Sequence, residues 1–119
     1  KTKGTDKIIL ITDAMPTVGS QKKEFWLGNE HIKAKDGKCT NADGVLAGSD
    51  LDMASAVKYI TEHVGFSLEQ AIEMASRSPA KFMKLENEVG SIAIGKKANF
   101  ALLDDKLDVL NVWIEGVQY

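Results

Sequence analysis

The sequence lacks the features that mark several large classes of protein. Cys39 is its only cysteine, so no internal disulfide can form, and a reducing, cytoplasmic location is expected. The formal net charge is only −2, whereas nucleic-acid binders usually carry a basic stripe. No apolar run approaches the roughly 18 residues of a membrane helix, and no signal-peptide core is visible. We therefore expect neither nucleic-acid nor membrane partners.

The length excludes one common enzyme fold. The 119 residues suit one ordinary domain, and a hydrophobic content of 44% is enough for a packed core. A complete (β/α)₈ barrel takes about 250 residues, so the chain cannot be a whole barrel. The first residue is Lys1 rather than methionine, and residues 2–6 show no apolar periodicity. We expect the chain either to begin partway through a longer protein or to start at a processing boundary.

The first half of the sequence contains two kinds of strand pattern, one after the other. Residues 7–13 are a β-branched, apolar run ending in Asp13. Such a run is typical of a central strand in a parallel sheet, buried on both faces. Turn dipeptides at Gly28-Asn29 and Asp36-Gly37 then predict a β-meander over residues 24–40.

Helix patterns come next, and the whole sequence predicts a mixed α/β fold. Ser49 is the expected N-cap of the first helix, Ser67 begins a capping-box pattern, and Ser78 with Pro79 suits the start of the third. The predicted helices cover residues 49–64, 67–77 and 79–84. The predicted strands that follow cover residues 90–95, 99–104, 109–115 and 117–119.

Asp13 is the first candidate for chemistry. A carboxylate at the C-terminal end of a buried parallel strand lies where barrel and open-sheet α/β enzymes place catalytic groups. The alternative is a structural role, because Asp readily caps a loop by bonding the backbone two residues further on. The residues alone leave both interpretations open.

Leu46, Ala47 and Gly48 form the second candidate. They lead into an expected helix N-terminus, whose N–H groups can hold an anion or a substrate oxygen, and Gly48 permits close backbone approach. A plain turn followed by an N-cap explains the same residues. His31 and His63 stand in neither an HxH nor an HExxH spacing, so no metal motif is present. Nucleotide-binding and serine-hydrolase motifs are also missing.

Longer stretches of the sequence resemble a known enzyme family. Thr12-Asp13-Ala14-Met15, combined with the stretch from Leu46 to Met53, closely resembles the C-terminal part of the N-acetylglucosamine-6-phosphate deacetylases of the amidohydrolase superfamily. Residues 90–104 look like the strand pair that closes many superfamily chains. The resemblance implies that residues 1–89 are the last strand and helices of a metal-dependent-hydrolase (β/α)₈ TIM barrel. Residues 90–119 would then be strands of a small β-sandwich domain.

The resemblance also implies a reaction. Family members use a divalent metal to hydrolyse the acetamide of an amino-sugar phosphate, giving glucosamine 6-phosphate and acetate in amino-sugar catabolism. Asp13 matches the catalytic aspartate, which takes a proton from the metal-bound water and delivers it to the departing nitrogen. Leu46, Ala47 and Gly48 match the substrate-contacting stretch. The ligands of the metal, zinc or iron, are a Glu and two His without counterparts here, so we assign no metal ligand in this chain.

Several expectations follow from the missing ligands. The chain alone is expected to be inactive, and the intact enzyme, which supplies the N-terminal part, is expected to be a homo-oligomer. Two alternatives remain: another amidohydrolase, acting on N-acetylgalactosamine 6-phosphate or an N-acyl amino acid, or a non-catalytic interaction module. An unpaired barrel strand would expose Ile8–Ile11 as an aggregation-prone run. We therefore expect a larger assembly, or strand pairing with another chain.

Overall fold

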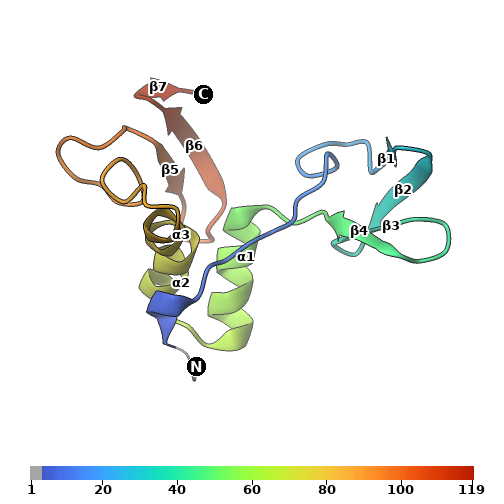
Figure 1. Cartoon of the computed structure of the whole chain (residues 1–119), viewed down its shortest axis with the longest axis horizontal. Helices are drawn as coiled ribbons and strands as arrows, with labels where there is room; N and C mark the ends of the chain where they lie inside the picture. Colours follow the sequence, from blue (N-terminus) through green and yellow to red (C-terminus); the bar gives the residue numbers. More distant parts are fainter. Residues whose placement is uncertain (1–3) are drawn as a thin grey trace. The chain divides into compact units, whose positions relative to one another are not determined.

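The computed structural model describes residues 4–119 and divides the chain into two compact units (Figure 1). Unit 2 consists of residues 11–53, and unit 1 contains residues 4–10 together with residues 54–119. Residues 1–3 of the expected domain 1–89 lie outside the described residues. Residues 90–119 belong to the same compact unit as the helices. The expected domain boundary between residues 89 and 90 stays a prediction.

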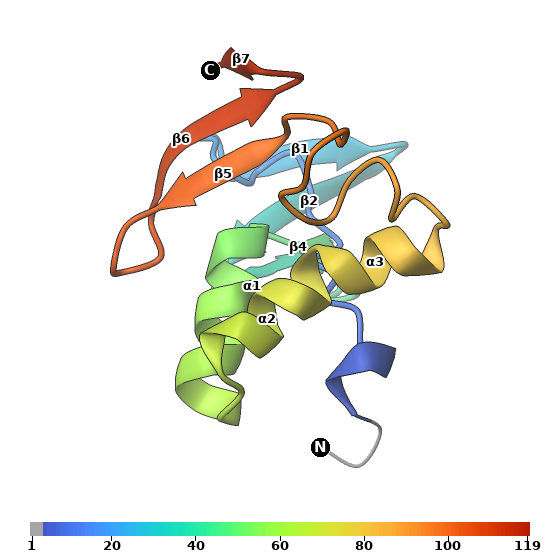
Figure 2. The ribbon, with the colours of Figure 1, turned by 90° about the vertical axis from the view of Figure 1, so that its left-hand side faces the viewer.

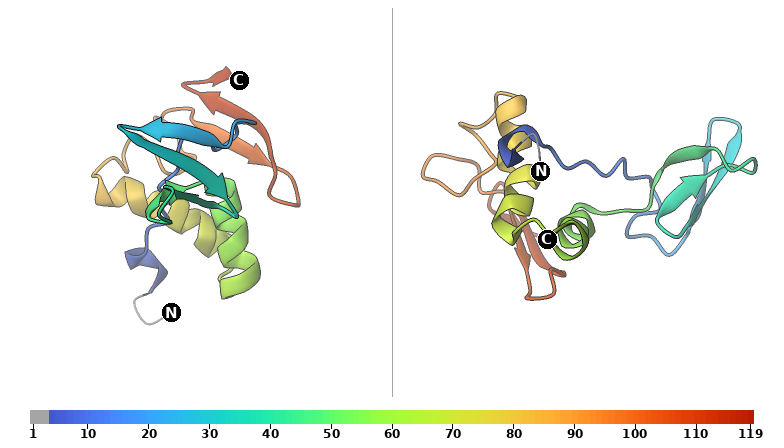
Figure 3. Two further views of the ribbon diagram at one scale, coloured as in Figure 1. Left: turned by 90° about the vertical axis from the view of Figure 1, so that its right-hand side faces the viewer. Right: turned by 90° about the horizontal axis from the view of Figure 1, so that it is seen from below.

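Unit 2 is built on a four-stranded antiparallel sheet in the order β1-β2-β3-β4 (Figure 3). Its strands are β1 (Glu24–Leu27), β2 (Glu30–Lys35), β3 (Lys38–Thr40) and β4 (Leu46–Ser49). The first three strands occupy the predicted meander, with tight turns at the two predicted dipeptides. Ile32 and Cys39 are completely buried, so they form the small core of this unit.

The predicted strand over residues 7–13 is wrong. Lys7 ends a 3₁₀ helix, η1 (Thr5–Lys7), and residues 8–13 belong to no strand. Within residues 4–119, few hydrogen bonds join this segment to other parts of the chain. Leu10 N–H donates to the Met74 carbonyl oxygen, and Ser49 donates to the carbonyl oxygens of Thr12 and Asp13. An apolar run becomes a paired strand only when a neighbouring backbone completes its ladder. Ile11 is accordingly 77% exposed rather than buried.

Unit 1 contains the helices (Figure 2). They are α1 (Met53–Tyr59), which continues as the π-helical turn η2 (Ile60–Val64), then α2 (Leu68–Ala75) and α3 (Arg77–Phe82). The predicted capping box on α2 is confirmed: Gln70 N–H donates to Ser67 Oγ at 3.3 Å, and Ser67 N–H donates to Gln70 Oε1 at 3.0 Å. Alanines and a methionine form the shared core, together with one valine: Ala56, Val57, Ala71, Met74 and Ala80.

Two predicted helix starts are wrong. Ser49 is the last residue of β4 rather than an N-cap, and α1 begins only at Met53. The α3 helix begins at Arg77, so Ser78 and Pro79 lie inside its first turn. Proline is tolerated there because the first N–H groups of a helix have no intrahelical acceptor. Ser49 could not be an N-cap because its hydrogen bonds join β4 to residues 12–15.

A three-stranded antiparallel sheet completes unit 1, and Figure 2 shows it beside α2 and α3. Its strands are β5 (Phe100–Leu103), β6 (Val109–Ile114) and β7 (Val117–Gln118). The predicted strand over residues 90–95 is wrong: this segment consists of bends and turns, and Ile92 is 85% exposed. No strand among residues 4–119 pairs with the segment, so its apolar pattern alone does not make a ladder. Between residues 4 and 119, no helix is both long and apolar enough to cross a membrane.

Candidate functional site

Unit 2 brings Asp13 beside β4, the strand that carries the second candidate group. Ser49 N–H donates to the Asp13 carbonyl oxygen at 2.9 Å, and Met15 N–H donates to the Ser49 carbonyl oxygen at 2.9 Å. These two bonds make a parallel bridge between Ala14 and Ser49. Asp13 and residues 46–48, separated by more than thirty positions in the sequence, therefore lie at one edge of the sheet.

The backbone of Asp13 adopts an uncommon conformation. Its φ is +52°, in the left-handed region that most non-glycine residues avoid and that Asp tolerates better than most. Its side chain is exposed. The loop-cap alternative would have the carboxylate accept from Met15 N–H, two residues on, yet that group donates to Ser49. The bond that the loop-cap alternative requires is thus not formed, and the side chain of Asp13 is open to solvent.

The three residues of the second group differ in exposure. Leu46 is 65% exposed, Ala47 is half-buried and Gly48 is buried. Gly48 has a φ of +143°, and a Cβ atom added there would lie 2.6 Å from Met15 Cγ and 3.0 Å from the Asp13 carbonyl oxygen. Only glycine fits this position. A second backbone segment therefore does lie close to Gly48, as predicted. Within unit 2 this segment is Asp13–Met15.

A polar network supports the same sheet. Lys23 Nζ pairs with Asp50 Oδ2 at 2.8 Å and donates to the Thr17 carbonyl oxygen at 2.9 Å. Thr17 is buried, with its hydroxyl 3.5 Å from Cys39 Sγ. Hydrogen bonds from Lys23 and then from Thr17 hold the pKa of the Asp50 carboxyl below its ordinary value, although desolvation opposes them. The network therefore ties the loop after Asp13 to the end of β4.

This network predicts a pH dependence of stability. Because the pKa of Asp50 is lower in the folded chain than in the unfolded chain, its stabilisation is complete above the ordinary carboxyl pKa. It is lost as the pH falls through the lowered value. Urea unfolding at a series of acidic pH values measures how far the free energy of unfolding falls with pH. This fall is expected to be smaller for Asp50→Asn than for the unchanged chain. Asp43→Asn, in the turn before β4, is the control, and equal pH dependence in all three proteins would contradict the prediction.

The described residues do not contain a metal centre of their own. No group of three or more His, Cys, Asp or Glu side chains within residues 4–119 could hold a metal ion. His31 stacks on Trp26 and lies 3.4 Å from Glu24, and His63 stacks on Tyr59. The donor set of residues 4–119 therefore does not fit a metal site, and the candidate chemistry is proton transfer by the Asp13 carboxylate.

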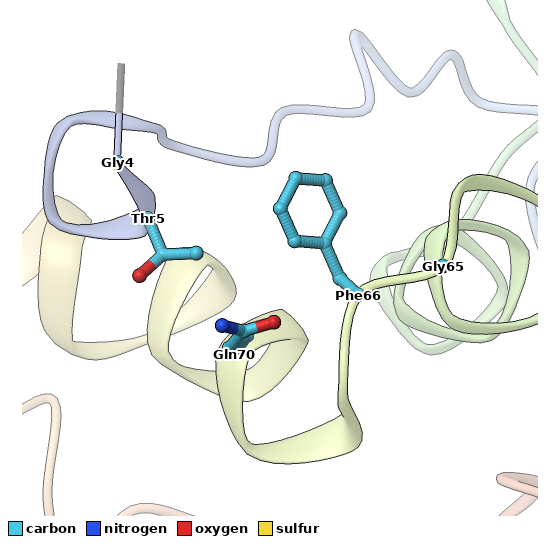
Figure 4. Close-up of a pocket in the computed structure, with 5 residues that line it drawn as sticks. All are labelled: Gly4, Thr5, Gly65, Phe66 and Gln70. Carbon is cyan, nitrogen blue, oxygen red and sulfur yellow. The ribbon is translucent and has the colours of Figure 1, made fainter. Parts of the chain in front are cut away.

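Two hollows in unit 1 differ in their lining: one has no titratable side chain, and the other is bordered by Glu69, Glu73, Arg77 and Lys97 among other residues. One, of about 390 Å³, is lined by Gly4, Thr5, Gly65, Phe66 and Gln70 (Figure 4). None of these five side chains titrates, so the hollow holds no acid or base. The other, of about 860 Å³, is bordered by residues of α2 and α3, the loop after Val89, and β5. Neither hollow is lined by Asp13 or by residues 46–48.

Ser49 and Met15 are the site residues that sequence reasoning missed. Ser49 was predicted to be a helix cap, whereas it bonds the backbone on both sides of Ala14. A glycine directly before Ser49 was the available signal, since such a glycine permits close approach of a second backbone segment. The sequence did not identify which segment approaches.

Comparison with known proteins gives a consistent result. The amidohydrolase family model matches residues 7–118. The chain is 41% identical over 116 residues to the N-acetylgalactosamine-6-phosphate deacetylase of Shewanella sp. (strain ANA-3), covering 98% of this chain and 29% of that protein. It is 32% identical over 110 residues to the N-acetylglucosamine-6-phosphate deacetylase of Vibrio furnissii, covering 92% of this chain and 28% of that protein.

A solved structure agrees with these sequence matches. The N-acetylglucosamine-6-phosphate deacetylase of Pasteurella multocida superposes with a TM-score of 0.89 at 30% identity, over 96% of this chain and 30% of that one. The chain thus spans less than a third of the length of these three proteins. Its mixed α/β fold is that of part of a deacetylase, as the resemblance predicted. The family is generally metal-dependent. With residues 7–118 matched, the chain belongs to the amidohydrolase family.

Proposed function

We propose that this chain supplies the proton-transfer carboxylate and a substrate-contacting strand to a deacetylase of N-acetylated amino-sugar phosphates. The observation that supports the proposal is the hydrogen bond from Ser49 N–H to the Asp13 carbonyl oxygen at 2.9 Å, which joins the backbone of Asp13 to the last residue of β4. The exposure of Asp13 and Leu46 supports it, because both side chains are open to a substrate. The similarity to deacetylases over nearly the whole chain supports it as well.

The proposed chemistry assigns one task to this chain. Water adds to the carbonyl carbon of the acetamide, and the Asp13 carboxylate accepts the proton that the water gives up. The same carboxyl group then delivers that proton to the amide nitrogen as the C–N bond breaks, so that acetate and the free amine leave. Leu46, Ala47 and Gly48 would contact the sugar. We propose that zinc or iron, which polarises the acetamide and activates water when bound, is held by residues outside this chain.

Two substrates remain in the proposal, because a specific observation favours each. N-acetylglucosamine 6-phosphate is the substrate class in the names of the Vibrio relative and the Pasteurella structure. N-acetylgalactosamine 6-phosphate appears in the name of the relative that is 41% identical. We further propose that the intact enzyme is a cytoplasmic homo-oligomer.

A chimera tests the proposal. In it, this chain replaces the matching segment of the Shewanella relative, and the release of acetate and free amine is measured with both sugar phosphates. The proposal predicts turnover by the chimera and none by the 119 residues alone. A folded, monodisperse chimera that releases no amine would contradict the enzyme proposal and favour an interaction module. Turnover by the isolated chain would contradict the proposal that the metal ligands lie elsewhere.

A further inference from the structure

We propose that Ser49 is a positioning residue that holds the backbone around Asp13 in its catalytic conformation. The inference rests on the proposed function, because it gives Ser49 a role only through the Asp13 carboxylate. Ser49 is the last residue of β4 and lies in the same compact unit as Asp13. It is half-buried, so it is less open to a substrate than Asp13 is.

Three hydrogen bonds join Ser49 to the residues around Asp13. Its N–H donates to the Asp13 carbonyl oxygen and its carbonyl oxygen accepts from Met15 N–H, each at 2.9 Å. Its hydroxyl donates to the Thr12 carbonyl oxygen. The Ser49 backbone and side chain thus bond the residues on both sides of Ala14. We call these three bonds the Ser49 clamp.

The clamp acts where the backbone needs support. Asp13 has a φ of +52°, which is unfavourable for a residue with a Cβ atom and persists only when its surroundings enforce it. The hydroxyl bond to Thr12 lies directly before this strained position, and the Met15 bond lies two residues after it. Without the hydroxyl, Thr12 and Asp13 gain access to extended conformations that turn the carboxylate in a different direction.

The clamp also fixes the carboxylate relative to the substrate-contacting strand. Ser49 follows Gly48 directly, so its bonds to residues 12–15 join Asp13 to the strand that contains Leu46, Ala47 and Gly48. The Ser49 hydroxyl additionally accepts from Leu51 N–H at 3.3 Å, which orients the hydroxyl proton towards Thr12. Small misplacements of a catalytic group lower turnover strongly, even when substrate binding is unchanged.

The test compares two substitutions in the chimera. Ser49→Ala removes the hydroxyl but keeps both backbone bonds, so kcat is expected to fall about tenfold to a hundredfold, with KM changed less than about twofold. Ser49→Thr retains a hydroxyl and is expected to restore kcat to within about threefold of the unchanged chimera. Ser20→Ala is the matched control, because the Ser20 hydroxyl accepts a local bond, from Lys22 N–H at 3.0 Å.

A second measurement uses the 119-residue chain itself and does not depend on activity. In Ser49→Ala, the backbone bond from Met15 N–H to the Ser49 carbonyl oxygen can still form, but loss of the hydroxyl bond to Thr12 is expected to let it open more often. Hydrogen exchange of the Met15 amide is therefore expected to be about tenfold faster. Unchanged Met15 exchange would overturn the clamp. If Asp13→Asn lowers turnover while Ser49→Ala leaves kcat within twofold, the Ser49 proposal alone fails. If Asp13→Asn leaves turnover unchanged, the proposed function fails, and the positioning role fails with it.

Discussion

Replacing Asp13 by asparagine is expected to lower the kcat of the chimera by about a hundredfold or more, the loss typical of removing a general acid–base group. Asparagine keeps the size of the side chain and tolerates a positive φ well, so the backbone at +52° needs no rearrangement. It cannot accept the proton of the attacking water. The loss is therefore expected in kcat, with little change in thermal stability, and is measured by acetate release under saturating substrate.

The chain contains a matched control for this substitution. Asp36 is also an aspartate with positive φ, at +51°, in the turn between β2 and β3. Asp36→Asn makes the same chemical change at nearly the same φ. Asp36 is not a member of the Ser49 clamp, although its neighbour Gly37 accepts from Asp50 N–H at 3.0 Å. Its turnover is expected to stay within about twofold of the unchanged chimera. Equal losses in Asp13→Asn and Asp36→Asn would remove Asp13 from the mechanism.

The second large effect is expected at Gly48. Gly48→Ala places a Cβ atom 3.0 Å from the Asp13 carbonyl oxygen and 2.6 Å from Met15 Cγ, at a φ of +143°. The backbone strain and the overpacking together are expected to cost about 2–5 kcal/mol of unfolding free energy. Because Met15 is flexible and the Asp13 carbonyl is not, part of the cost is expected as weakening of the clamp. Urea unfolding measures the first effect, and Met15 amide exchange measures the second.

Gly44→Ala separates backbone strain from close contact. Gly44 has a φ of +79°, and a Cβ atom there would meet nothing within 4 Å. Its substitution is expected to cost about 1–2 kcal/mol, from the left-handed backbone alone. A Gly48→Ala chain that is no less stable than Gly44→Ala would contradict the close packing of β4 on residues 13–15.

Local signals predicted much of the fold. The β1-β2-β3 meander follows from turn dipeptides that accept positive φ, and such turns need only their own residues. The α2 capping box likewise depends on two side chains three positions apart. The first helical segment ends at residue 64 as predicted, and Gly65 follows it with a φ of +78°. These features are determined by sequence neighbours and are therefore visible in one sequence.

Pairing between distant segments could not be predicted in the same way. Residues 7–13 have the composition of a buried strand, but within residues 4–119 they meet no backbone that completes a ladder. Residues 90–95 differ from their prediction for the same reason. Ser49 has the residue type of a helix cap, yet its partners lie more than thirty positions earlier. Residue type indicates which bonds a side chain can make, but not which distant segment supplies the partner.

The candidate site was only partly predictable. Asp13 and residues 46–48 were found separately, Asp13 from its place at the end of an apolar run and both from the family resemblance. Their position at one sheet edge, and the Ser49 clamp that places them there, come from the three-dimensional arrangement of unit 2.

Acetate release from three proteins, measured side by side at saturating N-acetylhexosamine 6-phosphate, tests the central claim most directly. The proteins are the Shewanella relative without the matching segment, the chimera, and the chimera with Asp13→Asn. Our account predicts no turnover by the first, turnover by the second, and a loss of about a hundredfold or more in the third. Equal turnover by the second and third proteins, or full turnover by the first, would contradict it.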